Sequence, residues 1–100
     1  MKFENFAVRK FLEETHQANH LTDREKQLIG LAVTTTRGCA LCSGGRIRRA
    51  LDSGIPWDTI IQAVDVASAV NAGVTTAIAL QGIQKENLTG PCQDGECVSA

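Results

Sequence analysis

Two cysteines separated by two residues, Cys39 and Cys42, are the part of this sequence best suited to chemistry. A Cys-x-x-Cys pair at the start of a helix brings its two sulfurs close enough to form a disulfide. The helix dipole and the free amides of the first turn favour a thiolate on Cys39. Arg46 lies one helical turn beyond Cys42, so its charge favours a thiolate on Cys42 instead. The pattern predicts a redox-active dithiol and leaves the nucleophile open, with two small buried apolar side chains as the structural alternative.

A second pair, Cys92 and Cys97, lies near the end of the chain with Gln-Asp-Gly-Glu between the two cysteines. An Asp-Gly turn allows the chain to fold back and bring these sulfurs together. Two such pairs in one chain suggest thiol–disulfide exchange between them, with the second pair as an accessory redox site. Incidental pairing without function is the alternative.

The cysteines could also bind zinc, because four thiolates form a tetrahedral site. Cys39 and Cys42 make a good half-site, whereas the spacing of the second pair is looser. His16 and His20, four residues apart, could share a helix face and bind a metal, but no carboxylate motif accompanies them. A domain with its own apolar core does not need a metal to fold. We therefore predict no metal site and no cofactor.

The overall composition restricts the partners and the compartment. The net charge of -1 gives no cation excess for binding nucleic acid, and the Arg46–Arg49 cluster is too short to form a basic stripe. The first six residues lack the apolar core of a secretory signal, and we expect no run that approaches the roughly 20 apolar residues of a membrane span. We predict a cytoplasmic protein that binds neither nucleic acid nor membrane, in which cysteines are redox-active or metal-binding rather than structural.

The first half of the sequence predicts three helices. Apolar residues at helical spacing indicate an amphipathic helix over about residues 3–19. Thr22-Asp23-Arg24-Glu25 fits a capping box, so a second helix should occupy about residues 23–37, with its apolar residues inside. Gly38 suits the left-handed residue that closes this helix. The next helix should carry the first cysteine pair and end at Ser53-Gly54.

The second half predicts a buried central helix. Pro56 fits a first helical turn, and residues 60–70 are almost continuously apolar. Gly73 should break this helix before a last one over about residues 74–87. A helix that is apolar on all sides needs partners on every side, and a chain of 100 residues is too short to supply them. We therefore expect a homo-oligomer.

The domain organisation follows from these elements. Small aliphatic residues dominate a composition with three Phe, one Trp and no Tyr, which favours helix packed on helix. After Leu88 the sequence consists mainly of turn-forming and polar residues. We predict an all-α bundle of about five helices over residues 1–88 and a flexible, cysteine-containing tail over residues 89–100.

The stretch from Gln27 to Cys42, followed by residues 50–54 and 60–63, resembles the carboxymuconolactone decarboxylase and alkyl hydroperoxidase D-like family. The resemblance covers about residues 21–84, with the helix-ending glycine, the dithiol and the next apolar helix in family order. It implies an all-α fold and a trimer or hexamer. In the peroxidase branch, it also implies a dithiol that works with a Glu and a His in a proton relay.

This chain departs from the family at both relay positions. Gln27 stands where the family has its Glu, and Arg46 stands where it has its His. Neither an amide nor a guanidinium accepts a proton at neutral pH. Glu25 could replace the missing carboxylate, although the capping box already accounts for it. The dithiol therefore carries over better than the relay does. The decarboxylase reaction carries over least, since no residue indicates a lactone acid beyond an Arg46 that could bind a carboxylate.

The function we predict is that of a thiol-disulfide oxidoreductase or a weak hydroperoxide reductase. Cys39 and Cys42 would cycle with a thiol redox partner, while Arg46 stabilises a thiolate and Gln27 occupies the other relay position. Two alternatives stay open. One is a non-enzymatic redox sensor or oligomeric interaction module, and the other is a zinc-binding structural protein.

Overall fold

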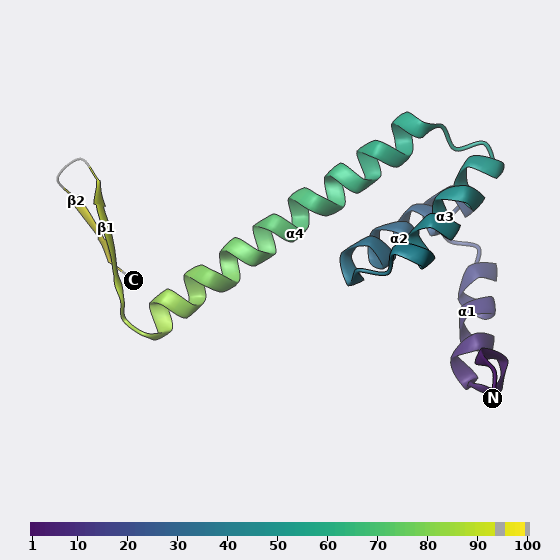
Figure 1. The fold of residues 1–100 in the computed structure, drawn as a ribbon, viewed down its shortest axis with the longest axis horizontal. Coiled ribbons are helices and arrows are strands. Elements are labelled where there is room, and N and C mark those ends of the chain that lie inside the picture. The colour runs from purple at the N-terminus through teal and green to yellow at the C-terminus, as the bar shows by residue number, and fades with distance from the viewer. Residues whose placement is uncertain (94–95, 100) are drawn as a thin grey trace. The chain divides into compact units, whose positions relative to one another are not determined.

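The computed structural model describes residues 1–93 and 96–99, with side chains as far as Pro91, and helices dominate it (Figure 1). The elements are η1 (Phe3–Asn5), α1 (Ala7–Gln17), α2 (Asp23–Arg37), α3 (Ala40–Asp52), α4 (Trp57–Lys85), β1 (Thr89–Gln93) and β2 (Glu96–Ser99). This confirms the predicted all-α class. Contacts group the chain into two units, Met1–Val64 and Asp65–Ala100, which are described separately below. The division into a domain of residues 1–88 and a tail stays a prediction.

The N-terminal segment forms two short helices rather than the single one predicted. Phe6 separates η1 from α1 with an extended backbone, at φ −98° and ψ 143°. The Asn5 side chain accepts a hydrogen bond from the Lys2 backbone N–H at 2.8 Å, which closes η1 as a separate turn. Helix α1 ends at Gln17, two residues before the predicted end, because Ala18 is also extended.

Local capping signals fix both ends of α2. Thr22 Oγ1 accepts a hydrogen bond from the Glu25 N–H at 3.1 Å, and the Glu25 carboxylate accepts one from the Thr22 N–H at 2.8 Å. The hydrogen bond from the Thr22 backbone to the Glu25 carboxylate, and after it the interaction of that carboxylate with the Thr22 side chain, lower the pKa of Glu25. At the other end Gly38 adopts the left-handed conformation with φ 85°. The predicted capping box and helix bounds are confirmed.

The core of the first unit lies between α2, α3 and the start of α4. The described side chains that are apolar and buried are Leu31, Ala50, Ile55 and Ile60, with Ile47, Leu51 and Val64 packed against them. The expectation that the apolar residues of α2 lie inside holds fully for Leu31 alone. Ile29 and Val33 are 52% and 54% exposed. The helix therefore shows apolar surface on the side opposite its core contact.

Helix α4 is continuous over 29 residues, so the predicted break at Gly73 is wrong. Glycine weakens a helix by about 1 kcal/mol but keeps its N–H and has no ring to clash with the preceding turn. The threonine hydroxyls just after it donate to backbone carbonyls one turn earlier, at 2.9 Å each, from Thr75 to Asn71 and from Thr76 to Ala72. The penalty of one glycine is too small to interrupt this hydrogen-bond ladder.

The apolar residues of α4 are largely exposed in the single chain. Within this helix, which is described throughout, Ile60 alone is fully buried, so the predicted buried central helix is not formed by one chain. Exposed members include Ile61, Val66, Val70, Val74, Ile78, Leu80 and Ile83. By length and composition α4 would also suffice to cross a bilayer, which corrects the expectation that no segment approaches that length, although core helices of assemblies share this property.

The segment predicted as a flexible tail contains a two-stranded antiparallel hairpin. In the register of β1 and β2, Cys92 is paired with Cys97 and Gln93 with Glu96. The chain thus folds back as predicted, while the Asp94-Gly95 turn lies outside the described residues. Flexibility of this segment, and exchange of Cys92 and Cys97 with the first cysteine pair, stay predictions.

Candidate functional site

The dithiol lies at the junction of α2 and α3. Cys39 is the N-cap residue of α3, directly after Gly38, and forms a disulfide with Cys42 across a Cα–Cα distance of 5.3 Å. The Ser43 hydroxyl, also in the first turn of α3, donates to Thr34 Oγ1 at 3.2 Å. This bond ties the first turn of α3 to the last turn of α2. The predicted placement of the dithiol at a helix start is confirmed.

The two sulfurs have different surroundings. The Cys42 N–H donates to Cys39 Sγ at 3.1 Å, so the Cys39 sulfur takes the place of the usual capping oxygen. Cys39 is half-buried, whereas Cys42 is exposed. Negative charge on the Cys39 sulfur is therefore favoured by an amide at the positive end of the helix. An incoming molecule reaches Cys42 more easily.

Gln27 and Arg46, the predicted relay positions, line one cavity of about 350 Å³ in the first unit. The Gln27 amide donates to Ser53 Oγ at 3.0 Å, which holds it near the end of α3. The Arg46 side chain lies over Gly30, where an added Cβ would be 2.9 Å from Arg46 Nε. The structure thus brings together two residues that are 19 positions apart (46 − 27). Neither cysteine lines this cavity.

Arg46 is a partly buried cation that forms no ion pair with any carboxylate of the described residues. Burial, and after it the charge of Arg49, lower the pKa of Arg46. Among the described residues, the ion pair that forms is the one between Arg9 and Glu13. No described carboxylate lies within 4 Å of the guanidinium of Arg46 or Arg49. An arginine stays charged at neutral pH even with a lowered pKa. The cavity wall, in which Asp23 is the acidic residue, therefore carries net positive charge.

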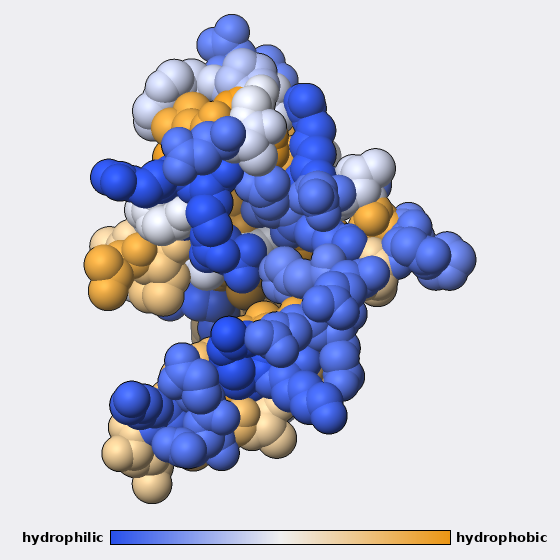
Figure 2. Space-filling view, turned by 90° about the vertical axis from the view of Figure 1, so that its right-hand side faces the viewer, coloured by the Kyte–Doolittle hydropathy of each residue, from blue (hydrophilic) through white to orange (hydrophobic). Residues whose placement is uncertain are grey.

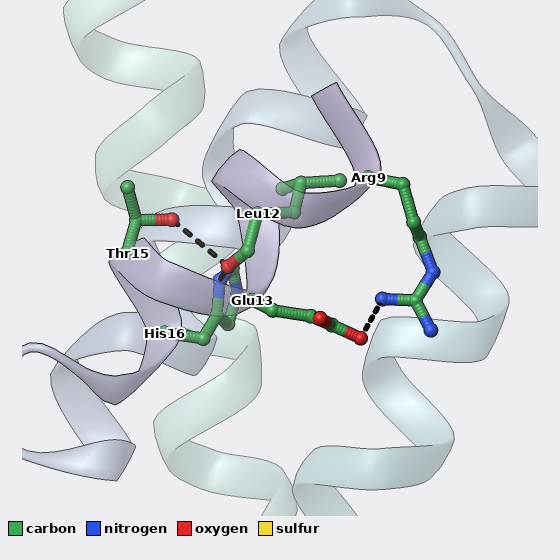
Figure 3. A network of polar contacts seen from close by, with 5 residues as sticks. All are labelled: Arg9, Leu12, Glu13, Thr15 and His16. Atoms are coloured by element: carbon green, nitrogen blue, oxygen red, sulfur yellow. Dashed lines mark hydrogen bonds and ion pairs between the residues drawn. The ribbon is translucent and has the colours of Figure 1, made fainter. Parts of the chain in front are cut away.

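His16 lines the same cavity, which sequence reasoning missed. Its Nδ1 lies 2.8 Å from the Leu12 carbonyl oxygen (Figure 3). Because a carbonyl can only accept, Nδ1 carries the hydrogen and Nε2 is left available to a ligand. Lys26 Nζ donates to the His16 carbonyl at 2.8 Å and so ties the end of α1 to α2. No spacing in the sequence signals this contact between separate helices.

The other candidates have simpler roles. Glu25 is engaged in the predicted capping box and is not among the residues that line the cavity. Among the described residues, no three His, Cys, Asp or Glu side chains converge on a possible metal position. The side chains of Cys92 and Cys97, needed for a four-cysteine zinc site, lie outside the description.

Comparison with known proteins agrees with this arrangement. A similar crystal structure is that of a protein from Methanobacterium thermoautotrophicum, with a TM-score of 0.73 and 27% identity, covering 81% of this chain and 93% of that one. No curated protein sequence matches the chain. The model of the carboxymuconolactone decarboxylase family matches residues 7–83, which include the dithiol, Gln27 and Arg46. The chain therefore belongs to the carboxymuconolactone decarboxylase family.

Proposed function

We propose that this protein is a thiol–disulfide oxidoreductase of the alkyl hydroperoxidase D-like type, which cycles Cys39 and Cys42 with a thiol redox partner. One observation carries the proposal: the disulfide has an exposed sulfur at Cys42 and, at Cys39, a sulfur that accepts a backbone N–H at a helix start. Such an asymmetric pair has one sulfur open to attack and one suited to leave as a thiolate.

Reduction of the disulfide proceeds in two steps. A partner thiolate attacks Cys42 Sγ, the new S–S bond forms, and the electron pair of the broken bond goes to Cys39 as a thiolate. The Cys42 N–H stabilises this leaving group. A second partner thiolate then attacks the partner's sulfur in the mixed disulfide and releases Cys42. Two electrons pass to the protein, and by microscopic reversibility the reduced protein attacks oxidised substrates through Cys42.

Hydroperoxide reduction is a second, weaker activity of the same pair. A thiolate would attack the O–O bond to give a sulfenic acid and an alkoxide that takes up a proton to leave as an alcohol. The other thiol would then displace water and form the disulfide. Gln27 and Arg46 do not supply that proton efficiently, so we expect low turnover.

The experiment that tests the proposal is trapping of the mixed disulfide. In Cys39→Ser the exposed Cys42 should form a stable adduct with glutathione disulfide, visible as a mass increase. The matched Cys42→Ser variant should form it several-fold more slowly, since the remaining sulfur is half-buried. Equal trapping in both variants would contradict the assigned roles. A redox sensor or interaction module would show the same trapping but no catalysed turnover of a disulfide substrate.

A further inference from the structure

The cavity beside Gln27 and Arg46 has an unusual charge balance for a site without a bound group. Its lining residues are His16, Asp23, Lys26, Gln27, Arg46 and Arg49. Three of these side chains are cationic and one is acidic, and the ammonium of Lys26 is directed to a carbonyl rather than to a carboxylate. No ion pair within the described residues offsets the two guanidinium groups.

Arg46 packs closely against the neighbouring helix α2. Its guanidinium lies directly over the backbone of Gly30, which has no side chain. A side chain at this position would displace the guanidinium. Holding a cation partly buried and beside a second cation costs free energy, and burial and Arg49 accordingly lower the pKa of Arg46. A bound anion would relieve both costs. The arrangement is thus prepared for negative charge.

An adjoining cavity of about 410 Å³ shares His16, Arg46 and Arg49 and adds apolar side chains. Phe3 and Leu12 line it together with the Arg9–Glu13 ion pair. The two arginines therefore line both spaces, and the second of these also has the apolar side chains of Phe3 and Leu12 in its wall. A ligand with an anionic head and a small organic body fits this combination better than a bare inorganic anion does.

We propose that Arg46 and Arg49 bind the carboxylate of a small organic acid, whose apolar body lies against Phe3 and Leu12. The guanidinium fork matches a carboxylate in bidentate geometry, and the space is within the usual range for small-molecule sites. The proposal that the two arginines bind a carboxylate rests on the geometry of the cavities alone. That the bound acid is also the molecule oxidised or reduced rests on the proposed function, because Arg46 follows Cys42 by one helical turn.

The test is calorimetric titration of the disulfide form with benzoate and, separately, with inorganic phosphate. Benzoate should bind more tightly than phosphate, and Arg49→Gln should weaken it about tenfold, since a charge-assisted hydrogen bond is lost. Arg48→Gln is the matched control, because Arg48 is exposed and lines neither cavity. Equal binding of phosphate and benzoate would overturn the assignment to an organic acid.

A second variant keeps every charge. Gly30→Ala should displace the Arg46 guanidinium, the movable end of a flexible side chain, and so weaken benzoate binding while the helical circular dichroism is retained. Wild-type affinity in both Gly30→Ala and Arg49→Gln, or an equal loss in Arg48→Gln, would overturn the proposal. The two proposals fail separately, because this test measures binding and not turnover. If the wild type does not bind benzoate but Cys42 is still trapped by glutathione disulfide, the organic-acid site fails and the redox function does not.

Discussion

At the scale of single residues, the functional character of this chain depends on what surrounds each sulfur and each relay position. The dithiol keeps the geometry that exchange chemistry needs, with one exposed and one amide-bonded sulfur. Gln27 is bonded to Ser53, and Arg46 is packed over Gly30. Two groups that would move protons are thus replaced by one that donates hydrogen bonds and one that holds a charge. The residues of this cavity thus suit the binding of an anion, as proposed above, better than proton transfer.

Restoring the relay should restore peroxidase activity. We expect the double variant Gln27→Glu with Arg46→His to raise hydroperoxide turnover by about 100-fold, the lower range for a positioned general acid–base. Arg46→His alone should change it much less, because Gln27 would still lack a carboxylate. Turnover with tert-butyl hydroperoxide under a regenerating dithiol measures both. A wild-type rate equal to that of the double variant would show that no relay is missing.

These residues also show what sequence reasoning could reach. The dithiol and its helix start were predictable because Gly38 and Cys39 are adjacent signals of one junction. The pairing of Gln27 with Arg46 followed from family resemblance. His16 was not predictable, because its place in the cavity depends on how α1 packs against α2 through the Lys26 bond. That contact has no counterpart in sequence spacing.

At the scale of elements, short-range capping explains the helix ends, and propensity alone does not explain helix continuity. The bounds of α2 follow from the reciprocal bonds at Thr22 and the left-handed Gly38. Helix α4 passes through Gly73 because a penalty near 1 kcal/mol is small beside a ladder of 29 residues. The chain reversal between Cys92 and Cys97 was predictable, but strands β1 and β2 were not, because strands of four and five residues carry little periodic signal.

The capping box at Thr22 makes a prediction about stability. Thr22→Ala should lower the free energy of unfolding by about 1 kcal/mol in urea denaturation, because the Glu25 N–H loses its partner. Thr36→Ala is the matched control, since this exposed threonine of the same helix makes no side-chain bond in the structure. An equal loss in both variants would assign the effect to helix propensity rather than to the cap.

The same cap gives a pH dependence with a definite sign. Because the folded state lowers the pKa of Glu25 from 4.5, its charged form stabilises the fold above that value. This contribution is lost as the pH falls through the lowered pKa. Wild type should therefore lose more stability than Glu25→Gln between neutral pH and acid, because the glutamine does not titrate while the Thr22 N–H still has an acceptor. Parallel stability curves for the two proteins would contradict this linkage.

At the scale of the whole molecule, a single chain leaves many large apolar side chains exposed. On the face shown in Figure 2, apolar residues appear between hydrophilic ones rather than under them. The described core consists of a few side chains, while most of the apolar residues of α4 remain accessible. The expected trimer or hexamer would bury this surface, and burial stabilises by about 25 cal/mol for each Å² of apolar surface removed from water. We therefore propose that assembly completes the fold.

Sedimentation velocity should find a trimer, a hexamer or at least a dimer at micromolar concentration. Ile78→Glu places a charge on the exposed apolar surface of α4 and should shift the protein toward smaller species. Gln84→Glu introduces the same charge at an exposed polar position of that helix and should leave the distribution unchanged. A wild-type chain that sediments as a compact, stable monomer would refute the proposal.

The close approach of Arg46 to Gly30 also constrains how this sequence could have diverged. A side chain at position 30 would displace the guanidinium, so Arg46 keeps this position only beside a glycine on the neighbouring helix. A relative with a shorter residue at position 46 has no such requirement. The two positions should therefore covary, with arginine at 46 found beside glycine at 30. In an ancestor without that glycine, an arginine at position 46 would have placed its guanidinium elsewhere, and it could take its present position only once the glycine had arisen.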